Sequence, residues 1–132
     1  MELDFNVTIK NARSQVVLNA IDAGSGNGKI KFYSATKPTA GAAITDQTLI
    51  ATVLFTDPCG VISSGTLTFS FDDDVLVGEG GTITWCRFTD SDDNYVLDGD
   101  VTDINGDGMI KIDFTTVYTG GTIRVLSAAF TE

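Results

Sequence analysis

The sequence predicts a mainly β fold, an antiparallel β-sandwich or jelly roll with one N-terminal helix. Apolar residues recur at helical spacing only over residues 6–22, and many short apolar stretches bounded by Gly, Asp or Asn follow from about residue 29. A parallel α/β sheet would need a helix between successive strands, and no such pattern recurs. The 132 residues fit the usual size of one domain, so we expect a single β-rich domain over 1–132.

The predicted helix has the sequence NVTIKNARSQVVLNAID, residues 6–22. The apolar positions that recur at helical spacing are Ile9, Ala12, Val16 and Ala20. Glycines then follow at Gly24, Gly26 and Gly28. Because glycine favours the end of a helix, we expect the helix to stop there and to cover one open face of the sandwich.

The first predicted strand is KIKFYS, in which Lys29, Lys31 and Tyr33 alternate with Ile30 and Phe32. TLIATVLF, residues 48–55, is more continuously apolar, which is typical of a central strand, and we expect it to end at Asp57-Pro58. Between them, residues 34–48 lack any period and predict a long surface loop of the kind that often carries interactions. The further predicted strands are GTLTFSF, GTITWCRF, NYVLDGDV, MIKIDFTTV and GTIRVLSAAF.

The charge pattern excludes some partners. A net charge of −10 repels a polyphosphate backbone, so we expect no nucleic-acid partner. No apolar run approaches the ~18 residues that span a bilayer, and the N-terminus lacks the pattern of a secretory signal, so we expect no membrane partner and no export. Residues 1–37 hold five basic and three acidic side chains, whereas the remainder is strongly acidic. This asymmetry favours either simple solvation or an N-terminal part that faces a partner.

The residue inventory argues against an enzyme. Histidine is absent, which removes the commonest general base and the commonest zinc ligand. Cys59 and Cys86 are too few for a zinc site, and we expect both to be reduced and buried rather than catalytic. Trp85 and Tyr95 could line a sugar platform, but Trp85 in a strand pattern is more typical of a core or an interface.

The stretch DINGDGMIKID, residues 103–113, resembles the start of a calcium loop, with oxygen-bearing side chains at Asp103, Asn105 and Asp107. The twelfth position, which must supply a closing carboxylate, is Phe114. The Asn-Gly and Asp-Gly pairs instead predict a β-hairpin reversal, and we expect no cofactor or metal. The aspartates between 90 and 113 are expected to be turn residues, with a cation held by loops of neighbouring hairpins as the alternative. Asp72–Asp74 is expected to be a solvated loop.

Four stretches between residues 11 and 101 stand out together, in chain order NARSQVVLNAID, GKIKFYSATKPT, LIATVLFTDP and GTITWCRFTDSDDNYVLDGDV. In this order they resemble a family of small structural proteins of tailed bacteriophages and prophages. None of these stretches contains a catalytic motif. The chain departs from the family pattern after Pro58, where Cys59-Gly60-Val61-Ile62 replaces small and aromatic residues.

The resemblance implies a non-enzymatic virion structural protein, assembled in the host cytoplasm. A small acidic β-rich domain suits a capsid decoration or cement protein that binds the outside of the major capsid protein shell and acts as a homo-oligomer, a dimer or trimer. The alternatives are a tail or neck component, or a glycan- or calcium-binding module displayed on the particle. Because the rest of the chain is acidic, we expect the shell to be contacted by the basic part and its loop, at Lys29, Lys31, Lys37 and Pro38.

Overall fold

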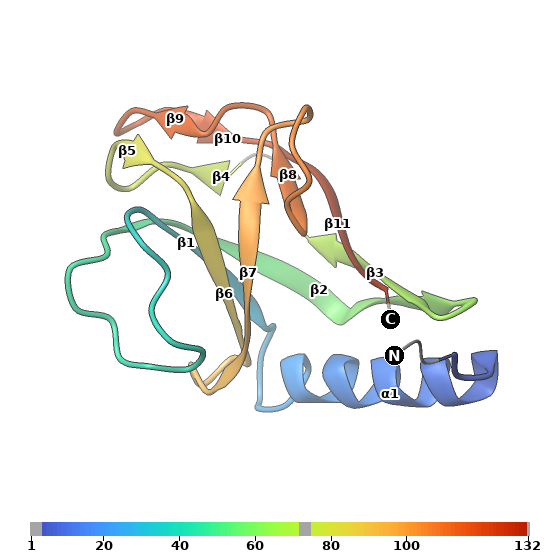
Figure 1. Ribbon diagram of the computed structural model, residues 1–132. Coiled ribbons are helices and arrows are strands. Elements are labelled where there is room, and N and C mark those ends of the chain that lie inside the picture. Colours follow the sequence, from blue (N-terminus) through green and yellow to red (C-terminus); the bar gives the residue numbers. More distant parts are fainter. Residues whose placement is uncertain (1–3, 72–74, 132) are drawn as a thin grey trace.

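The computed structural model describes residues 4–71 and 75–131 (Figure 1). The predicted solvated loop at Asp72–Asp74 lies outside the described residues. The elements are α1 (Val7–Ile21), β1 (Lys29–Tyr33), β2 (Leu49–Ser63), β3 (Thr66–Phe71), β4 (Val75–Leu76), β5 (Gly81–Thr82), β6 (Trp85–Thr89), β7 (Tyr95–Thr102), β8 (Ile110–Ile112), β9 (Thr116–Val117), β10 (Thr122–Ile123) and β11 (Val125–Thr131). Within these ranges no helix has the length and apolarity to cross a membrane.

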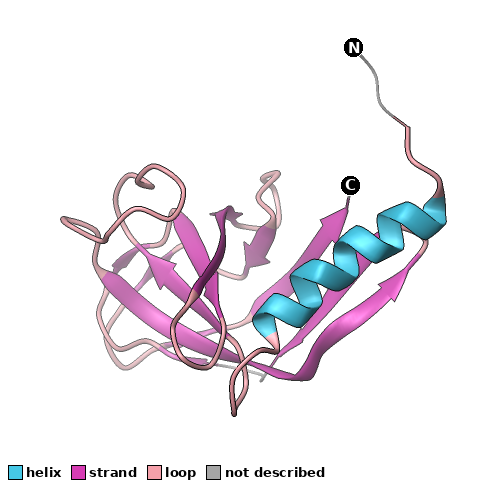
Figure 2. Ribbon diagram, turned by 90° about the horizontal axis from the view of Figure 1, so that it is seen from below, coloured by secondary structure: helices cyan, strands magenta, loops and turns pink. Residues whose placement is uncertain are grey.

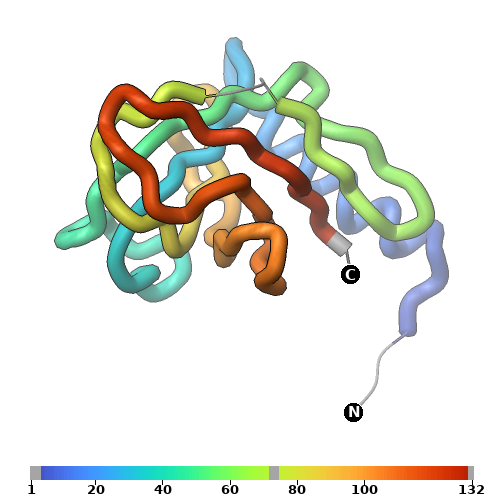
Figure 3. Tube along the Cα trace, turned by 90° about the horizontal axis from the view of Figure 1, so that it is seen from above, coloured from blue at the N-terminus to red at the C-terminus, as the bar shows by residue number. Residues whose placement is uncertain are grey.

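The main sheet closes into a seven-stranded barrel in the order β1-β2-β3-β11-β8-β7-β6. Its pairings are antiparallel except that of β7 with β8, which is parallel. Figure 3 shows β11 in red between β3 in yellow-green and β8 in orange. Two short pairs, β4–β10 and β5–β9, lie outside the ring. The predicted mainly β fold with one N-terminal helix is confirmed, but the sandwich or jelly roll is wrong, because one sheet closes on itself.

Strand β2 makes this closure possible because it pairs with two strands, one along each part of its length. Its first part pairs with β1, and its second part pairs with β3 as far as Ser63. The predicted end at Asp57-Pro58 is therefore wrong. The β2–β3 register shifts between Phe55 and Gly60, so the proline, which has no N–H to donate, lies in a bulge and not in the regular ladder.

Inward-facing side chains fill the barrel. On β1 the predicted alternation holds from Lys29 to Phe32, since Ile30 and Phe32 are fully buried within the core, whereas Tyr33, on the outer face, is buried as well. Phe55, Phe69 and Phe88 form a central cluster, with ring centroids 5.1–5.4 Å apart. Cys59 and Cys86 are both buried and unbridged, as predicted. Burial raises the pKa of the Cys59 thiol to about 12, so this thiol stays protonated near neutral pH.

The predicted helix is confirmed as α1, and it lies along the β2–β3 hairpin (Figure 2). Asn6 caps it by accepting a hydrogen bond from the Ile9 N–H at 2.9 Å. The Asn11 side chain accepts from the Gly65 N–H at 2.8 Å, which ties the helix to the tip of the hairpin. At its other end, the Asp22 carboxylate accepts from the Cys59 N–H at 3.0 Å. These bonds orient the helix on the strands.

The apolar stripe that predicted this helix does not face the barrel. Ile9 and Val16 are 43% and 68% exposed, whereas Ser14 and Ile21 are fully buried. The helix therefore packs through a neighbouring face, because its polar contacts to the hairpin and the buried Ile21 set its rotation. The outward face keeps the exposed apolar side chains of Ile9 and Val16, and Phe5, just before the helix, lies under the Arg13 guanidinium at 4.9 Å.

Ser14 provides a test of this packing, because its buried hydroxyl has no hydrogen-bond partner among the described residues. We expect Ser14→Ala to raise the free energy of unfolding by about 1 kcal/mol, since it removes an unsatisfied polar group and favours the helix. Urea denaturation measures the change. As a control, Ile21→Ala should lower stability by about 2–5 kcal/mol. A loss of more than about 1 kcal/mol in Ser14→Ala would contradict this packing.

Candidate functional site

The outer face of β1, β6 and β7 carries a layered cluster of aromatic and charged side chains. Tyr33 and Trp85 are opposite each other on β1 and β6, and their rings stack with centroids 4.6 Å apart and an interplanar angle of 15°. Trp85 is 1% exposed, so its predicted burial is confirmed. It lies outside the barrel core and beneath residues 34–48. Its Nε1 donates a hydrogen bond to the Ser34 carbonyl at 3.2 Å.

Arg87 is the centre of this cluster. Its Nε and Nη2 donate to the two carboxylate oxygens of Asp98 at 2.7 and 3.1 Å, a bidentate pair in which both side chains are largely buried. The guanidinium also lies over the rings of Trp85 and Tyr95, at 5.4 and 5.1 Å from their centroids. Hydrogen bonding to Asp98 raises the pKa of Arg87, so the pair stays ionised.

The same ion pair holds the loop of residues 34–48. Arg87 Nη1 donates to the Ala42 carbonyl at 2.9 Å, and the Asp98 carboxylate accepts from the Gly41 N–H at 3.3 Å. At the base of the loop, Ser34 N–H donates to the Thr48 carbonyl, and Gln47 Nε2 crosses to the Thr36 carbonyl at 2.7 Å. The predicted surface loop is thus present (Figure 1). Arg87 and Asp98 hold its tip, and its base is closed by these internal bonds and held by the bond from Trp85 to the Ser34 carbonyl.

The predicted contact residues lie on and beside this loop. Lys29 and Lys31 point outward from β1, and both bind Asp93, with N···O distances of 3.0 and 2.8 Å. Hydrogen bonds from Lys31 and Lys29 lower the pKa of Asp93. Lys37 is exposed on the loop, and Pro38 is half-buried there. Of the three lysines, Lys37 is therefore the one without an ion-pair partner in the described part of the chain.

A structured turn between β6 and β7 presents Asp93 to these lysines. The Asp90 carboxylate accepts from the N–H groups of Asp92 and Asn94, both at 2.9 Å, and from the Asn94 side chain at 3.0 Å. The bonds from Asn94 lower the pKa of Asp90. Asp93 then adopts a φ of +67°, a conformation that aspartate tolerates better than most residues. The predicted acidic turn is thus a specific support for the basic strand.

The segment 103–108 is not the predicted hairpin. β7 and β8 are parallel, so this segment returns the chain to the start of a neighbouring strand that runs the same way. Thr102 Oγ1 accepts from the Gly108 N–H at 3.0 Å, and a Cβ at Gly106 would come within 2.6 Å of Thr102. The glycines are needed for close approach to Thr102, and neither has a positive φ.

The alternative metal ligands Asp103, Asn105 and Asp107 lie in this segment. The Asp103 carboxylate accepts from the Asn105 N–H at 2.9 Å, as in a local turn. Within residues 4–71 and 75–131, no three His, Cys, Asp or Glu side chains gather closely enough to hold an ion.

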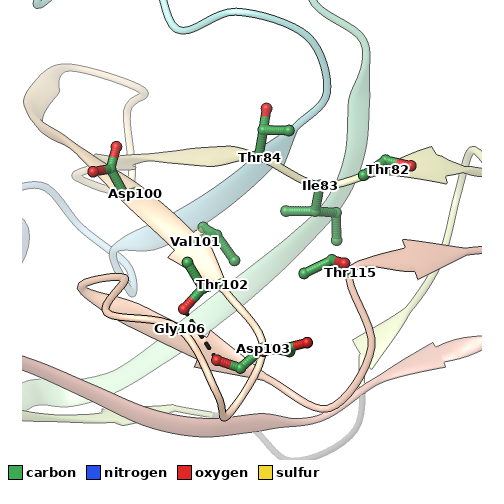
Figure 4. A pocket seen from close by; sticks show the side chains of 9 residues that line it. All are labelled: Thr82, Ile83, Thr84, Asp100, Val101, Thr102, Asp103, Gly106 and Thr115. Atoms are coloured by element: carbon green, nitrogen blue, oxygen red, sulfur yellow. Dashed lines mark hydrogen bonds between the residues drawn. The ribbon is translucent and has the colours of Figure 1, made fainter.

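A groove of about 570 Å³ opens beside the segment (Figure 4). Its lining is rich in hydroxyl and carboxylate groups: Thr82, Ile83, Thr84, Asp100, Val101, Thr102, Asp103, Gly106 and Thr115. Most of its hydroxyls already serve the fold, since Thr84 Oγ1 donates to the Ala35 carbonyl and Thr102 Oγ1 to that of Asp103. These hydroxyls therefore hold the base of the 34–48 loop and the β7–β8 connection.

Comparison with family models, curated proteins and solved structures finds no match to this chain. The site must therefore be interpreted from its own geometry. Sequence reasoning missed Arg87 and Asp98, which organise the loop. The sequence places Arg87 on the same strand face as Trp85 and just before the acidic stretch, which indicates an ion pair. The spacing along the chain does not identify which aspartate is its partner.

The Arg87–Asp98 pair gives a direct test of loop anchoring. We expect Asp98→Ala to lower the free energy of unfolding by about 3 kcal/mol, because it leaves a buried guanidinium unpaired. Residues 34–48 should also become more susceptible to limited proteolysis. Asp100→Asn on the same strand is the control, since this exposed carboxylate makes no hydrogen bond in the described structure, and it should change stability by less than about 0.5 kcal/mol. Equal effects of the two variants would contradict this role of the pair.

Proposed function

We propose that this chain is a non-enzymatic structural protein of a virion, a decoration or cement protein that binds the outside of a major capsid protein shell. The observation that carries the proposal is the anchored loop 34–48, a long exposed segment without regular secondary structure that is nonetheless held at its tip and its base. The family resemblance of the sequence supports the choice of partner. In this proposal the protein is part of the virion and is assembled in the host cytoplasm.

Anchoring gives the loop an advantage in binding. A flexible loop of this length loses conformational entropy when a partner orders it, and that loss reduces affinity. Here the ion pair Arg87–Asp98 and the stacked Trp85 order the loop before any partner arrives. Lys37, Pro38 and Ile44 are therefore displayed on a rigid support, with Ile44 36% exposed.

The charges favour docking through this side of the barrel. An acidic chain of net charge −10 is repelled by another acidic surface unless a basic group mediates the contact. Lys37 is exposed on the loop and can mediate such a contact. Lys29 and Lys31 lie on β1, which leads into the loop. Because Asp93 is half exposed, its ion pairs with Lys29 and Lys31 are weak and can be exchanged for pairs with a partner.

A second surface supports assembly into a dimer or trimer. Helix α1 lies apart from the anchored loop (Figure 1), and its outward face exposes Ile9 and Val16, with Phe5 exposed just before it. Exposed apolar side chains that follow one helix face are typical of protein–protein contacts. We assign the contact between copies to this face, which leaves the loop available for the shell.

A tail or neck position is the alternative within the virion. A capsid role requires many copies at regular lattice positions, whereas a neck role requires small rings. Quantitative mass spectrometry of purified virions measures the copy number per particle. Copies comparable in number to the major capsid protein support decoration, and a copy number of one small ring contradicts it.

Charge reversal tests the docking side. We expect Lys37→Glu to weaken binding to undecorated particles and to reduce its salt dependence, because rim charges act mainly on association. Reversing Lys31 and Lys37 together should weaken it further. The measurement is binding of purified protein to particles by cosedimentation at low and high salt.

Two variants serve as controls. Lys111→Glu on β8 changes the net charge by the same amount away from the loop and should leave binding near that of the parent. Asp93→Asn releases Lys29 and Lys31 and should strengthen binding at low salt. If Lys37→Glu binds as well as the parent while charge reversals within 90–107 abolish binding, the acidic segment and not the basic side contacts the shell.

A further inference from the structure

Two large aromatic side chains stand exposed on the loops around β9. Phe114 is 70% exposed and Tyr118 is 77% exposed, yet they line one pocket of about 290 Å³. The rest of its lining is Thr116, Val117, Gly121 and Thr122. β9 and β10 lie at the upper left of Figure 1, well separated from α1 and from the 34–48 loop at the lower left. The pocket is therefore distinct from both surfaces described above.

The backbone under each aromatic residue is held in place. Asp113 Oδ1 accepts from the N–H groups of Phe114 and Arg124 at 2.9 and 3.2 Å, which fixes the bend where Phe114 lies. Tyr118 begins a tight turn, because its carbonyl accepts from the Gly121 N–H at 2.9 Å. Gly120 is the third residue of this β-turn and has a φ of +87°, the positive value that a type II turn requires there.

Hydrogen bonds to Val77 secure the Tyr118 turn from the other side. The Gly120 N–H donates to the Val77 carbonyl at 3.0 Å, and the Val77 N–H donates to the Gly121 carbonyl at 2.8 Å. Val77 itself belongs to the hydrophobic core. The two exposed rings thus rise from a fixed support, a preorganisation that favours ligand binding.

The polar groups of the pocket are neutral. Among the residues that the structure describes, no charged side chain lines it. Thr116 Oγ1 pairs with Thr82 Oγ1 at 3.2 Å across β5 and β9, which leaves each hydroxyl with further hydrogen-bonding capacity. The Thr122 side chain is exposed at the rim. A ligand that suits this lining has an apolar face for the rings and hydroxyl groups for the threonines.

We propose that the Phe114–Tyr118 pocket binds a neutral carbohydrate. A pyranose ring has this combination of an apolar C–H face and a rim of hydroxyls, and the pocket is close to the lower size limit of small-molecule sites, about 300 Å³, which suits one or two sugar units. Anionic glycans are disfavoured because the chain carries a net charge of −10. The sugar platform considered at Trp85 is excluded, since that ring is buried under the 34–48 loop.

The inference is independent of the proposed virion function, because it concerns a separate surface of the isolated chain. The test uses the full-length protein on an array of neutral oligosaccharides of glucose, galactose, mannose and N-acetylglucosamine, with sialylated and sulfated glycans beside them. Isothermal titration then measures the affinity for the best neutral oligosaccharide. We expect a dissociation constant between about 10 μM and 1 mM, typical of a small open site.

Phe114→Ala and Tyr118→Ala should each weaken this binding by about tenfold or more, because each removes one aromatic wall. Thr122→Val should weaken it less. Leu76→Ala on β4 is the matched control, since Leu76 is 66% exposed but does not line the pocket, and it should bind as the parent does. All four side chains are exposed, so melting temperatures should stay near that of the parent.

Three results would overturn the inference: no neutral glycan bound at about 10 mM, binding restricted to anionic glycans, or binding unchanged in both aromatic variants. Loss of particle attachment in Phe114→Ala without any glycan binding would also overturn it, because the pocket would then be a protein contact. The three glycan results do not bear on Lys37 and the docking loop, so the two proposals fail separately, whereas lost attachment in Phe114→Ala would place a particle contact at this pocket.

Discussion

Parallel hydrogen bonding between β7 and β8 closes the ring of strands, and the candidate surfaces depend on that closure. A closed barrel has no free edges in its ring, and its interior here is occupied by the Phe55, Phe69 and Phe88 cluster. Because the interior is full, the loops have to fold against the outside of the wall. The features with binding potential are therefore all on outer faces or at the ends of strands.

Side chains on both faces of β6 are buried. Cys86 and Phe88 point into the core, while Trp85 and Arg87 point outward, and all five residues of the strand are buried. The outward pair is covered because the 34–48 loop folds over it. A buried ion pair contributes little net stability compared with an apolar contact, but it constrains geometry strongly. Arg87–Asp98 orders the loop through one such constraint.

Three surfaces result, and they differ in chemistry. The anchored loop offers a lysine and apolar groups, the outward face of α1 exposes apolar side chains, and the Phe114–Tyr118 pocket is aromatic and neutral. Their separation on the barrel is compatible with a protein that contacts a shell, a second copy and a small ligand at once (Figure 1). A small domain can hold three such surfaces because the closed barrel supplies its stability internally.

The sequence by itself determined the helix, the β class, the alternation of Lys29, Lys31 and Tyr33 with Ile30 and Phe32, and the existence of the 34–48 loop. These features follow from local periodicity and turn chemistry, which a single stretch of chain contains. Tertiary structure alone decided the rest. Barrel closure, the continuation of β2 past Pro58, the parallel course after residues 103–108 and the rotation of α1 all depend on partners distant in sequence. The same holds for the site, because Arg87 meets Asp98 and Ala42 only through strand pairing and loop folding, and spacing along the chain does not encode those contacts.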